Sequence, residues 1–122
     1  MIERGSVVLV DLDSTRGHEQ RGLRACVVVS DSEVVGSQRY PLVGVVPLTT
    51  RAGEGALYAQ VGEGASGLRQ ASWALADQVR SVDKRRVVRL VGRVADGELA
   101  AIERGLALFL GMLSQGKPPR SW

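Results

Sequence analysis

The side chains that could carry out catalysis are of few kinds. The chain of 122 residues holds one histidine, His18, and one cysteine, Cys26. A pair of histidines for acid–base catalysis cannot be built within one chain, and neither a metal-ligand spacing nor a phosphate-binding GxxxxGK(S/T) motif occurs. Any catalysis must therefore use arginine, threonine, serine, glutamate, aspartate or glutamine, and we expect neither a metal ion nor an organic cofactor.

Positive charge is concentrated in one stretch of the chain. The net charge is +3, and residues 77–93 contain six basic side chains against two acidic ones. A basic stretch favours a polyanionic partner such as a nucleic acid. It is equally typical of a solvated polar surface. The charge alone leaves both interpretations open.

The hydrophobic pattern predicts several short strands. Residues 6–11 are nearly all apolar and β-branched, which is typical of a strand buried on both faces. Further strands are expected at 23–30, 43–49, 56–61, 71–79 and 87–94, with a turn or short helix at 81–86. The alanines of 71–79 would also suit a helix. Pro47 cannot donate to a strand ladder and is expected at an edge or a bulge.

The last element is predicted to be a helix. Apolar residues recur at spacings of three and four from Leu99 to Leu113, Asp96 can act as the N-cap, and Gly116 can end the helix. The fold class is therefore mainly β, a small curled antiparallel sheet with a C-terminal helix. Residues 1–116 are expected to form one domain, with a flexible tail at 117–122.

The location of the protein is expected to be cytoplasmic. The first residues show no charged-then-apolar signal pattern, and no apolar stretch approaches the length needed to cross a bilayer. We therefore expect no membrane partner. The single cysteine, Cys26, lies in an apolar run and is expected to be a buried small side chain.

Four segments carry distinctive runs of residues. They are RGSVVLVDLDSTRGHEQ at 4–20, GLRACVVVS at 22–30, VVPLTT at 45–50 and ADQVRSVDKRR at 76–86. These runs resemble, in the same order, the signature blocks of the MazF/PemK/Kid toxins. Ser14 and Ala25 stand where that family usually has proline, which loosens the backbone there but removes no functional group.

The resemblance implies a fold, an assembly and a reaction. The fold would be the small antiparallel SH3-like barrel of the CcdB/Kid/MazF type. The assembly would be a homodimer, with a groove for single-stranded RNA that crosses the subunit interface. The reaction would be metal-independent, sequence-specific cleavage of mRNA, in which a ribose 2′-hydroxyl attacks the adjacent phosphate and leaves a 2′,3′-cyclic phosphate and a 5′-hydroxyl. A cognate MazE-like antitoxin, with an acidic and partly disordered tail, would neutralise the toxin.

The resemblance also implies catalytic residues. Arg24 and Thr49 match the catalytic arginine and threonine of the family, although Thr50 competes with Thr49 for its role. A guanidinium can hold two phosphate oxygens at once, but its pKa above about 12 makes it a poor general base. Glu19 is a candidate to accept the 2′-hydroxyl proton. Apart from the resemblance, an exposed edge arginine and an ordinary strand threonine would be the plainer interpretations.

A further set of polar residues is expected to bind RNA. The resemblance places Gln20 beside the scissile phosphate and in contact with bases. Gln78 can read a base edge and Arg80 can contact a phosphate, whereas Arg16 and His18 could touch RNA or simply face solvent. The set consists of Arg16, His18, Gln20, Thr50, Asp77, Gln78 and Arg80.

Two other functions fit the same pattern. A CcdB-like protein would poison DNA gyrase by binding and would not need Arg24 or Thr49. A catalytically inactive RNA-binding regulator would keep the fold without the reaction. The end of the chain, residues 117–122, gives no support to the CcdB-like function, and the presence of the expected side chains argues against the inactive regulator.

Overall fold

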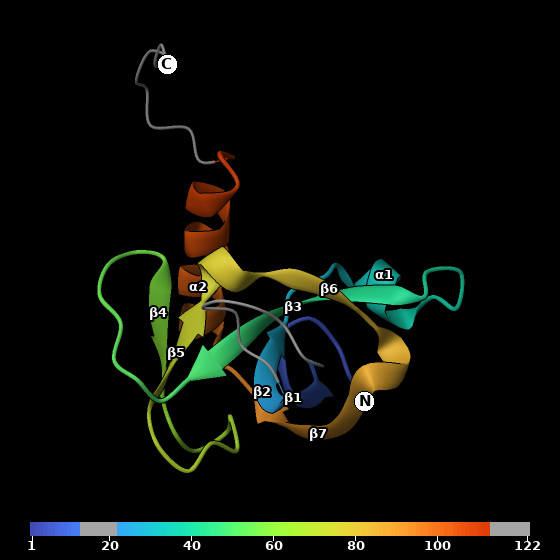
Figure 1. Ribbon diagram of the computed structural model, residues 1–122, viewed down its shortest axis with the longest axis horizontal. Helices are drawn as coiled ribbons and strands as arrows, with labels where there is room; N and C mark the ends of the chain where they lie inside the picture. Colours follow the sequence, from blue (N-terminus) through green and yellow to red (C-terminus); the bar gives the residue numbers. More distant parts are fainter. Residues whose placement is uncertain (13–21, 113–122) are drawn as a thin grey trace.

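Seven strands form one curled antiparallel sheet in the computed structural model, which describes residues 1–12 and 22–112 (Figure 1). The order of strands across the sheet is β4-β5-β3-β2-β1-β7, and β6 pairs with the first half of β3. The strands are β1 (Ser6–Asp11), β2 (Leu23–Val28), β3 (Leu42–Thr49), β4 (Tyr58–Val61), β5 (Ser72–Leu75), β6 (Arg80–Asp83) and β7 (Val87–Arg93).

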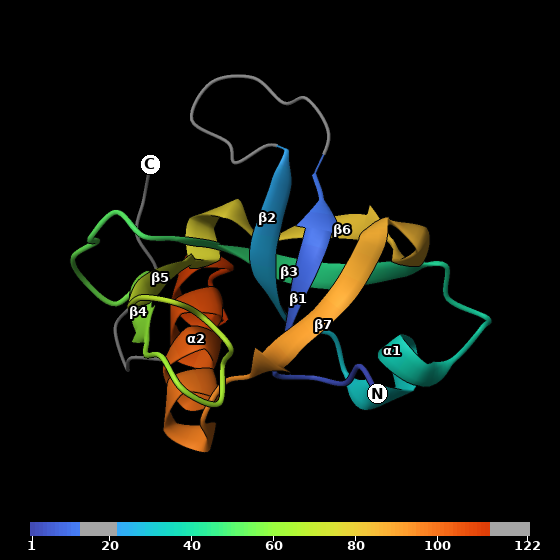
Figure 2. The same ribbon diagram turned by 90° about the horizontal axis from the view of Figure 1, so that it is seen from below.

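Two α-helices lie at opposite ends of the molecule, as both ribbon views show (Figure 1 and Figure 2). The N-cap of the short α1 (Ser32–Gly36) is Asp31, whose carboxylate accepts a hydrogen bond from the backbone N–H of Glu33 at 3.0 Å. The longer α2 (Asp96–Phe109) packs against β4 and against the 3-10 helix η1 (Ala76–Gln78). A second 3-10 helix, η2 (Lys84–Arg86), joins β6 to β7.

Both faces of the central strands are buried. Alternate side chains of β1, β2 and β3 pack on one face against α2, in a cluster that includes Val7, Val27, Val46 and Ile102. The other face, with Val8, Val28 and Val45, lines the inside of the curl. The prediction that residues 6–11 form a strand buried on both faces is confirmed.

The predicted fold class, mainly antiparallel β with a C-terminal helix, is also confirmed. Within the described ranges, the end strands β4 and β7 do not pair with each other, so the sheet curls without closing. No helix among the described residues is long and apolar enough to cross a membrane. The predicted domain end at residue 116 and the tail at 117–122 lie outside the described residues.

Several element boundaries differ from those predicted. Half of the expected turn at 81–86 is strand β6, because it pairs with β3 from Leu42↔Asp83 to Val45↔Arg80. The strand predicted at 71–79 ends at Leu75 and continues as η1.

The predicted ends of the last helix were both wrong. The N-cap residue is Ala95 rather than Asp96. The N–H of Ala95 donates to the Glu98 carboxylate at 2.9 Å, so the Glu98 side chain supplies the capping hydrogen bond. It ends at Phe109 rather than near Gly116 because Gly111, with a φ of +72°, adopts the left-handed conformation that terminates helices.

Candidate active site

Strand β3 changes partners at Pro47. Its ladder with β2 runs from Val28↔Val45 to Cys26↔Pro47, and its ladder with β5 begins at Leu48. On the edge away from β2, pairing with β6 stops at Val45. Pro47 is buried and stays in register with Cys26 of β2, so the prediction that it lies at an edge or a bulge was wrong.

The pattern of strand pairing explains why a proline, which has no backbone N–H, is tolerated at position 47. The N–H of Val29 donates to the carbonyl oxygen of Gly44 at 3.0 Å, and bonded and non-bonded pairs alternate along an antiparallel ladder. Cys26–Pro47 is therefore a non-bonded pair, and the proline nitrogen faces the interval between the β6 and β5 ladders. Beyond this point β2 and β3 separate.

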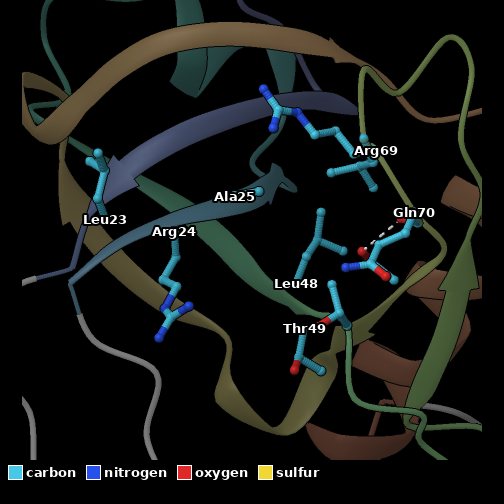
Figure 3. A pocket seen from close by; sticks show the side chains of 10 residues that line it. Leu23, Arg24, Ala25, Leu48, Thr49, Arg69 and Gln70 are labelled. Carbon is cyan, nitrogen blue, oxygen red and sulfur yellow. Dashed lines mark hydrogen bonds between the residues drawn. The ribbon is translucent and has the colours of Figure 1, made fainter.

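The separating strand ends bring Arg24 and Thr49 together. Arg24 comes two residues before Cys26 on β2, and Thr49 comes two residues after Pro47 on β3, so each lies just beyond the last pair of the β2–β3 ladder. Both side chains line an open hollow of about 260 Å³, called here the Arg24 hollow (Figure 3). Its other lining residues are Leu23, Ala25, Leu48, Thr50, Leu68, Arg69, Gln70 and Ser72. Arg24 is exposed and Thr49 is half-buried, so both are accessible to a ligand.

The hydroxyl of Thr49 is oriented by its own turn. Its Oγ1 accepts a hydrogen bond from the backbone N–H of Arg51 at 3.2 Å, which leaves the O–H hydrogen available to donate elsewhere. Thr50 lines the same hollow but is more exposed, and within residues 1–12 and 22–112 its hydroxyl accepts no such hydrogen bond. The geometry favours Thr49 over Thr50 for a fixed donor.

A second hollow lies on the other side of Thr49. It has a volume of about 270 Å³ and is called here the Asp77 hollow; it is lined by Thr49, Arg51, Ala52, Gly53, Tyr58, Leu75, Asp77 and Gln78. The Tyr58 hydroxyl donates to Asp77 Oδ2 at 2.6 Å, and this hydrogen bond to the carboxylate raises the pKa of Tyr58. Thr49 therefore stands between the two hollows.

The structure brings five of the proposed site residues to these hollows. Arg24, Thr49 and Thr50 line the first, and Asp77 and Gln78 line the second. Arg80 is not among the lining residues of either, and its guanidinium donates to the carbonyl oxygen of Leu12 at 3.3 Å.

The remaining proposed site residues belong to the segment between β1 and β2. Arg16, His18, Glu19 and Gln20 all lie outside the described residues, and their roles stay predictions.

Most of the basic stretch at 77–93 stabilises the fold. Lys84 Nζ donates to the carbonyl oxygens of Val34 (2.6 Å) and Ser37 (2.8 Å), which ties η2 to α1. Arg85 forms an ion pair with Asp83 at 2.9 Å, and its hydrogen bonds hold the pKa of that carboxyl at about 2. Arg93 pairs with Glu3 at 2.8 Å. The six basic side chains of this stretch are not among the lining residues of either hollow.

Residues that the sequence did not point to also line the hollows. Arg69 and Gln70 reach the first from the loop before β5, and Arg51 and Tyr58 reach the second. The loop contains a glycine-rich turn at 62–67, with positive φ at Gly64 and Gly67. Nothing local in the sequence indicates that the loop folds back to the ends of β2 and β3.

Cys26 lies on β2, two residues after Arg24, and is not a nucleophile. Its side chain is fully buried, and burial raises the pKa of the thiol to about 12. The Sγ–H donates to the carbonyl oxygen of Arg24 at 3.8 Å. As predicted, this cysteine is a small buried side chain.

The fold of this chain is similar to that of solved MazF proteins. MazF from Deinococcus radiodurans is 28% identical and superposes with a TM-score of 0.78, over 91% of this chain and 97% of that one. The MazE–MazF complex of the same organism (Form-II) is 27% identical with a TM-score of 0.73, over 92% and 97% of the two chains.

Sequence comparison identifies the family. Endoribonuclease MazF9 of Mycobacterium tuberculosis is 32% identical over 118 residues, which cover 93% of this chain and 100% of the relative. The family described as the PemK-like, MazF-like toxins of type II toxin-antitoxin systems matches residues 3–110. The chain belongs to this toxin family, and the resemblance seen in its sequence is confirmed.

Proposed function

We propose that this chain, an endoribonuclease toxin of the MazF type, cleaves single-stranded mRNA at specific sequences by metal-independent transesterification. The observation that carries the proposal is that Arg24 and Thr49 line the same open hollow. In the reaction, the ribose 2′-oxygen bonds to phosphorus while the bond from phosphorus to the 5′-oxygen breaks. The products are a 2′,3′-cyclic phosphate and a 5′-hydroxyl.

Arg24 and Thr49 are suited to stabilise the transition state. Negative charge builds on the non-bridging phosphate oxygens as the 2′-oxygen attacks, and the Arg24 guanidinium can donate to two of them. The Thr49 hydroxyl, oriented by the Arg51 N–H, can donate to the same phosphate. A preorganised donor of this kind is commonly worth about 3 kcal/mol in the transition state.

Two proton transfers complete the reaction. The 2′-hydroxyl proton must pass to a base, for which Glu19 is our candidate, and the departing 5′-oxygen must receive a proton. A guanidinium carries only hydrogen-bond donors, so Arg24 can deliver a proton to the leaving oxygen more readily than it can accept one. The segment that carries Glu19 joins the ends of β1 and β2, and the β2 end lines the Arg24 hollow.

The two hollows provide places for the nucleotides on either side of the cut. Asp77 and Gln78 carry acceptors and donors that can read base edges in the Asp77 hollow. Arg16, His18, Gln20 and Arg80 complete the proposed RNA-binding set. Sequence specificity would come from the base contacts, and affinity from the contacts to phosphates.

The proposed partners follow from the family. The solved MazE–MazF complex supports a cognate MazE-like antitoxin for this chain as well. A homodimer would cover apolar side chains that are exposed on the single chain near the end of α2; these are Leu108, Phe109, Leu110 and Met112. Because the proposed substrate is mRNA, we place the action of the toxin in the cytoplasm.

The experiment that tests the proposed function is cleavage of a long natural RNA by purified protein in EDTA. We expect defined cuts at a short recurring sequence, with 5′-hydroxyl and 2′,3′-cyclic phosphate ends identified by end-specific ligation. Intact RNA under these conditions, with inhibition of DNA gyrase by the same preparation, would instead establish the CcdB-like function. Cleavage that begins only when a divalent metal is added would refute the metal-independent reaction.

A further inference from the structure

Arg69 is a cation at the Arg24 hollow that the reaction described above does not use. It is exposed and lines the hollow together with Arg24 and Thr49. Within the part of the chain that the structure describes, no acidic side chain pairs with its guanidinium. By contrast, Arg85 and Arg93 are both held in ion pairs. Arg69 is therefore available to an anionic ligand.

The loop that carries Arg69 is held firmly in place. Ser66 is buried, its Oγ donates to the carbonyl oxygen of Gly62 at 2.6 Å, and that Oγ accepts the N–H of Leu68 at 3.2 Å. The N–H of Arg93 donates to the carbonyl oxygen of Ala65 at 2.9 Å, which fastens the loop to the end of β7. Such a loop presents Arg69 without a large ordering cost on binding.

The loop can approach β7 closely because two glycines have no side chain. A Cβ on Gly67 would lie 2.3 Å from the carbonyl oxygen of Val91, and one on Gly92 would lie 2.4 Å from backbone atoms of Ala65 and Ser66. Gly67 also has a φ of +76°, which disfavours other residues. These contacts fix the position of the loop relative to the sheet.

The positions of Arg24 and Arg69 suggest a path for the RNA backbone. In Figure 3 the Arg24 and Arg69 side chains extend in opposite directions, and Ala25 appears between them in this view. Thr49 extends to the same side as Arg24. We propose that Arg69 binds the phosphate adjacent to the scissile one, so that two successive phosphates of the RNA lie across Ala25.

This inference rests on the proposed function and adds a binding residue to it. A guanidinium suits the task because it donates to two phosphate oxygens at once. The contact is with a phosphate that does not react, so Arg69 contributes to affinity rather than to the chemical step. A contact of this kind is also independent of base sequence and sensitive to salt.

The test compares Arg69→Gln with a matched control, Arg89→Gln. Arg89 is an exposed arginine on β7 that lines neither hollow, so its variant has the same charge change away from the site. The probe is a fluorescein-labelled RNA that spans a mapped cut site, with a 2′-deoxy sugar at the cut nucleotide to prevent cleavage. Binding is followed by anisotropy from low to high salt, and cleavage of the all-ribose RNA gives kcat.

We expect Arg69→Gln to raise Kd by about fivefold, as for the loss of one exposed ion pair, while kcat stays unchanged. The slope of log Kd against log salt should fall by about 0.7, the value for one phosphate of a single strand. Arg89→Gln should change neither quantity. Equal Kd values for the two variants, or a fall in kcat at unchanged Kd, would overturn the inference while leaving the nuclease intact.

A neutral phosphate identifies the contact itself. A methylphosphonate is placed either 5′ or 3′ of the scissile phosphate, with a 2′-deoxy sugar before it. One of the two positions should weaken binding by wild type but not by Arg69→Gln, because the cation that it pairs with has already been removed. Equal losses in both proteins at both positions would exclude Arg69 as the partner. Failure to find any cut site would overturn the proposed function and this inference with it.

Discussion

Replacement of Arg24 by alanine is expected to reduce kcat by about 10²–10³-fold, which is the usual effect of removing one preorganised donor from a developing oxyanion. The side chain is exposed at the end of β2, so the variant should fold normally. The measurement is the single-turnover rate for a labelled RNA at saturating protein, which isolates the chemical step from binding.

Two controls define what the arginine does. Arg24→Lys keeps the positive charge but loses the planar pair of donors, and we expect a rate between those of wild type and Arg24→Ala. Arg89 is an exposed arginine away from both hollows, so the Arg89→Ala variant should cleave the RNA at the wild-type rate. A rate for Arg24→Ala within a few-fold of wild type would show that this guanidinium is not part of the reaction.

Replacement of Gly92 by alanine is expected to lower the free energy of unfolding by about 1–3 kcal/mol, the usual cost of overpacking. The new Cβ would lie 2.4 Å from the carbonyl oxygens of Ala65 and Ser66, and backbone atoms cannot move aside as a flexible side chain can. The loop must therefore shift, and the hydrogen bond from the Arg93 N–H to Ala65 would weaken. Urea denaturation followed by circular dichroism measures the change.

The matched control is Gly97→Ala. Gly97 lies in the first turn of α2, where a Cβ would meet no atom within 4 Å, and alanine favours helix by about 0.5–1 kcal/mol. The control should be as stable as wild type or slightly more stable. If Gly92→Ala matched Gly97→Ala, the close approach of the loop to β7 would not be needed. Because this loop carries Arg69, Gly92→Ala should also bind RNA more weakly than Gly97→Ala.

The site could be predicted from the sequence only in part. The runs around Arg24 and Thr49 singled out both residues, because the types and their order resemble those of a known family. Their juxtaposition depends on the β2–β3 register and on the change of partner at Pro47. Those features are set by pairing between segments about 20 residues apart, which local patterns do not report.

Most of the errors in the sequence-based predictions also arise from contacts between segments distant in the sequence. Residues 81–83 were expected to belong to a turn or short helix because only Val82 among them is apolar, and pairing with β3 makes them part of a strand. Arg69 was not predicted to be a site residue because the contact that positions its loop, between Gly67 and Val91, joins residues 24 apart in the sequence. The end of α2 was misplaced because the apolar spacing continues past Gly111, whereas the left-handed backbone there stops the helix.

The most direct test of the account is a double-mutant cycle between Arg24 and Thr49, measured as single-turnover cleavage rates. Thr49→Val, which removes the hydroxyl at nearly constant volume, should slow wild type by about tenfold, and Thr50→Val should have little effect. In the Arg24→Ala background, Thr49→Val should cost much less than tenfold, because two groups that hold one phosphate act as a unit. Fully multiplicative effects, or a larger loss from Thr50→Val than from Thr49→Val, would contradict a shared grip on the scissile phosphate.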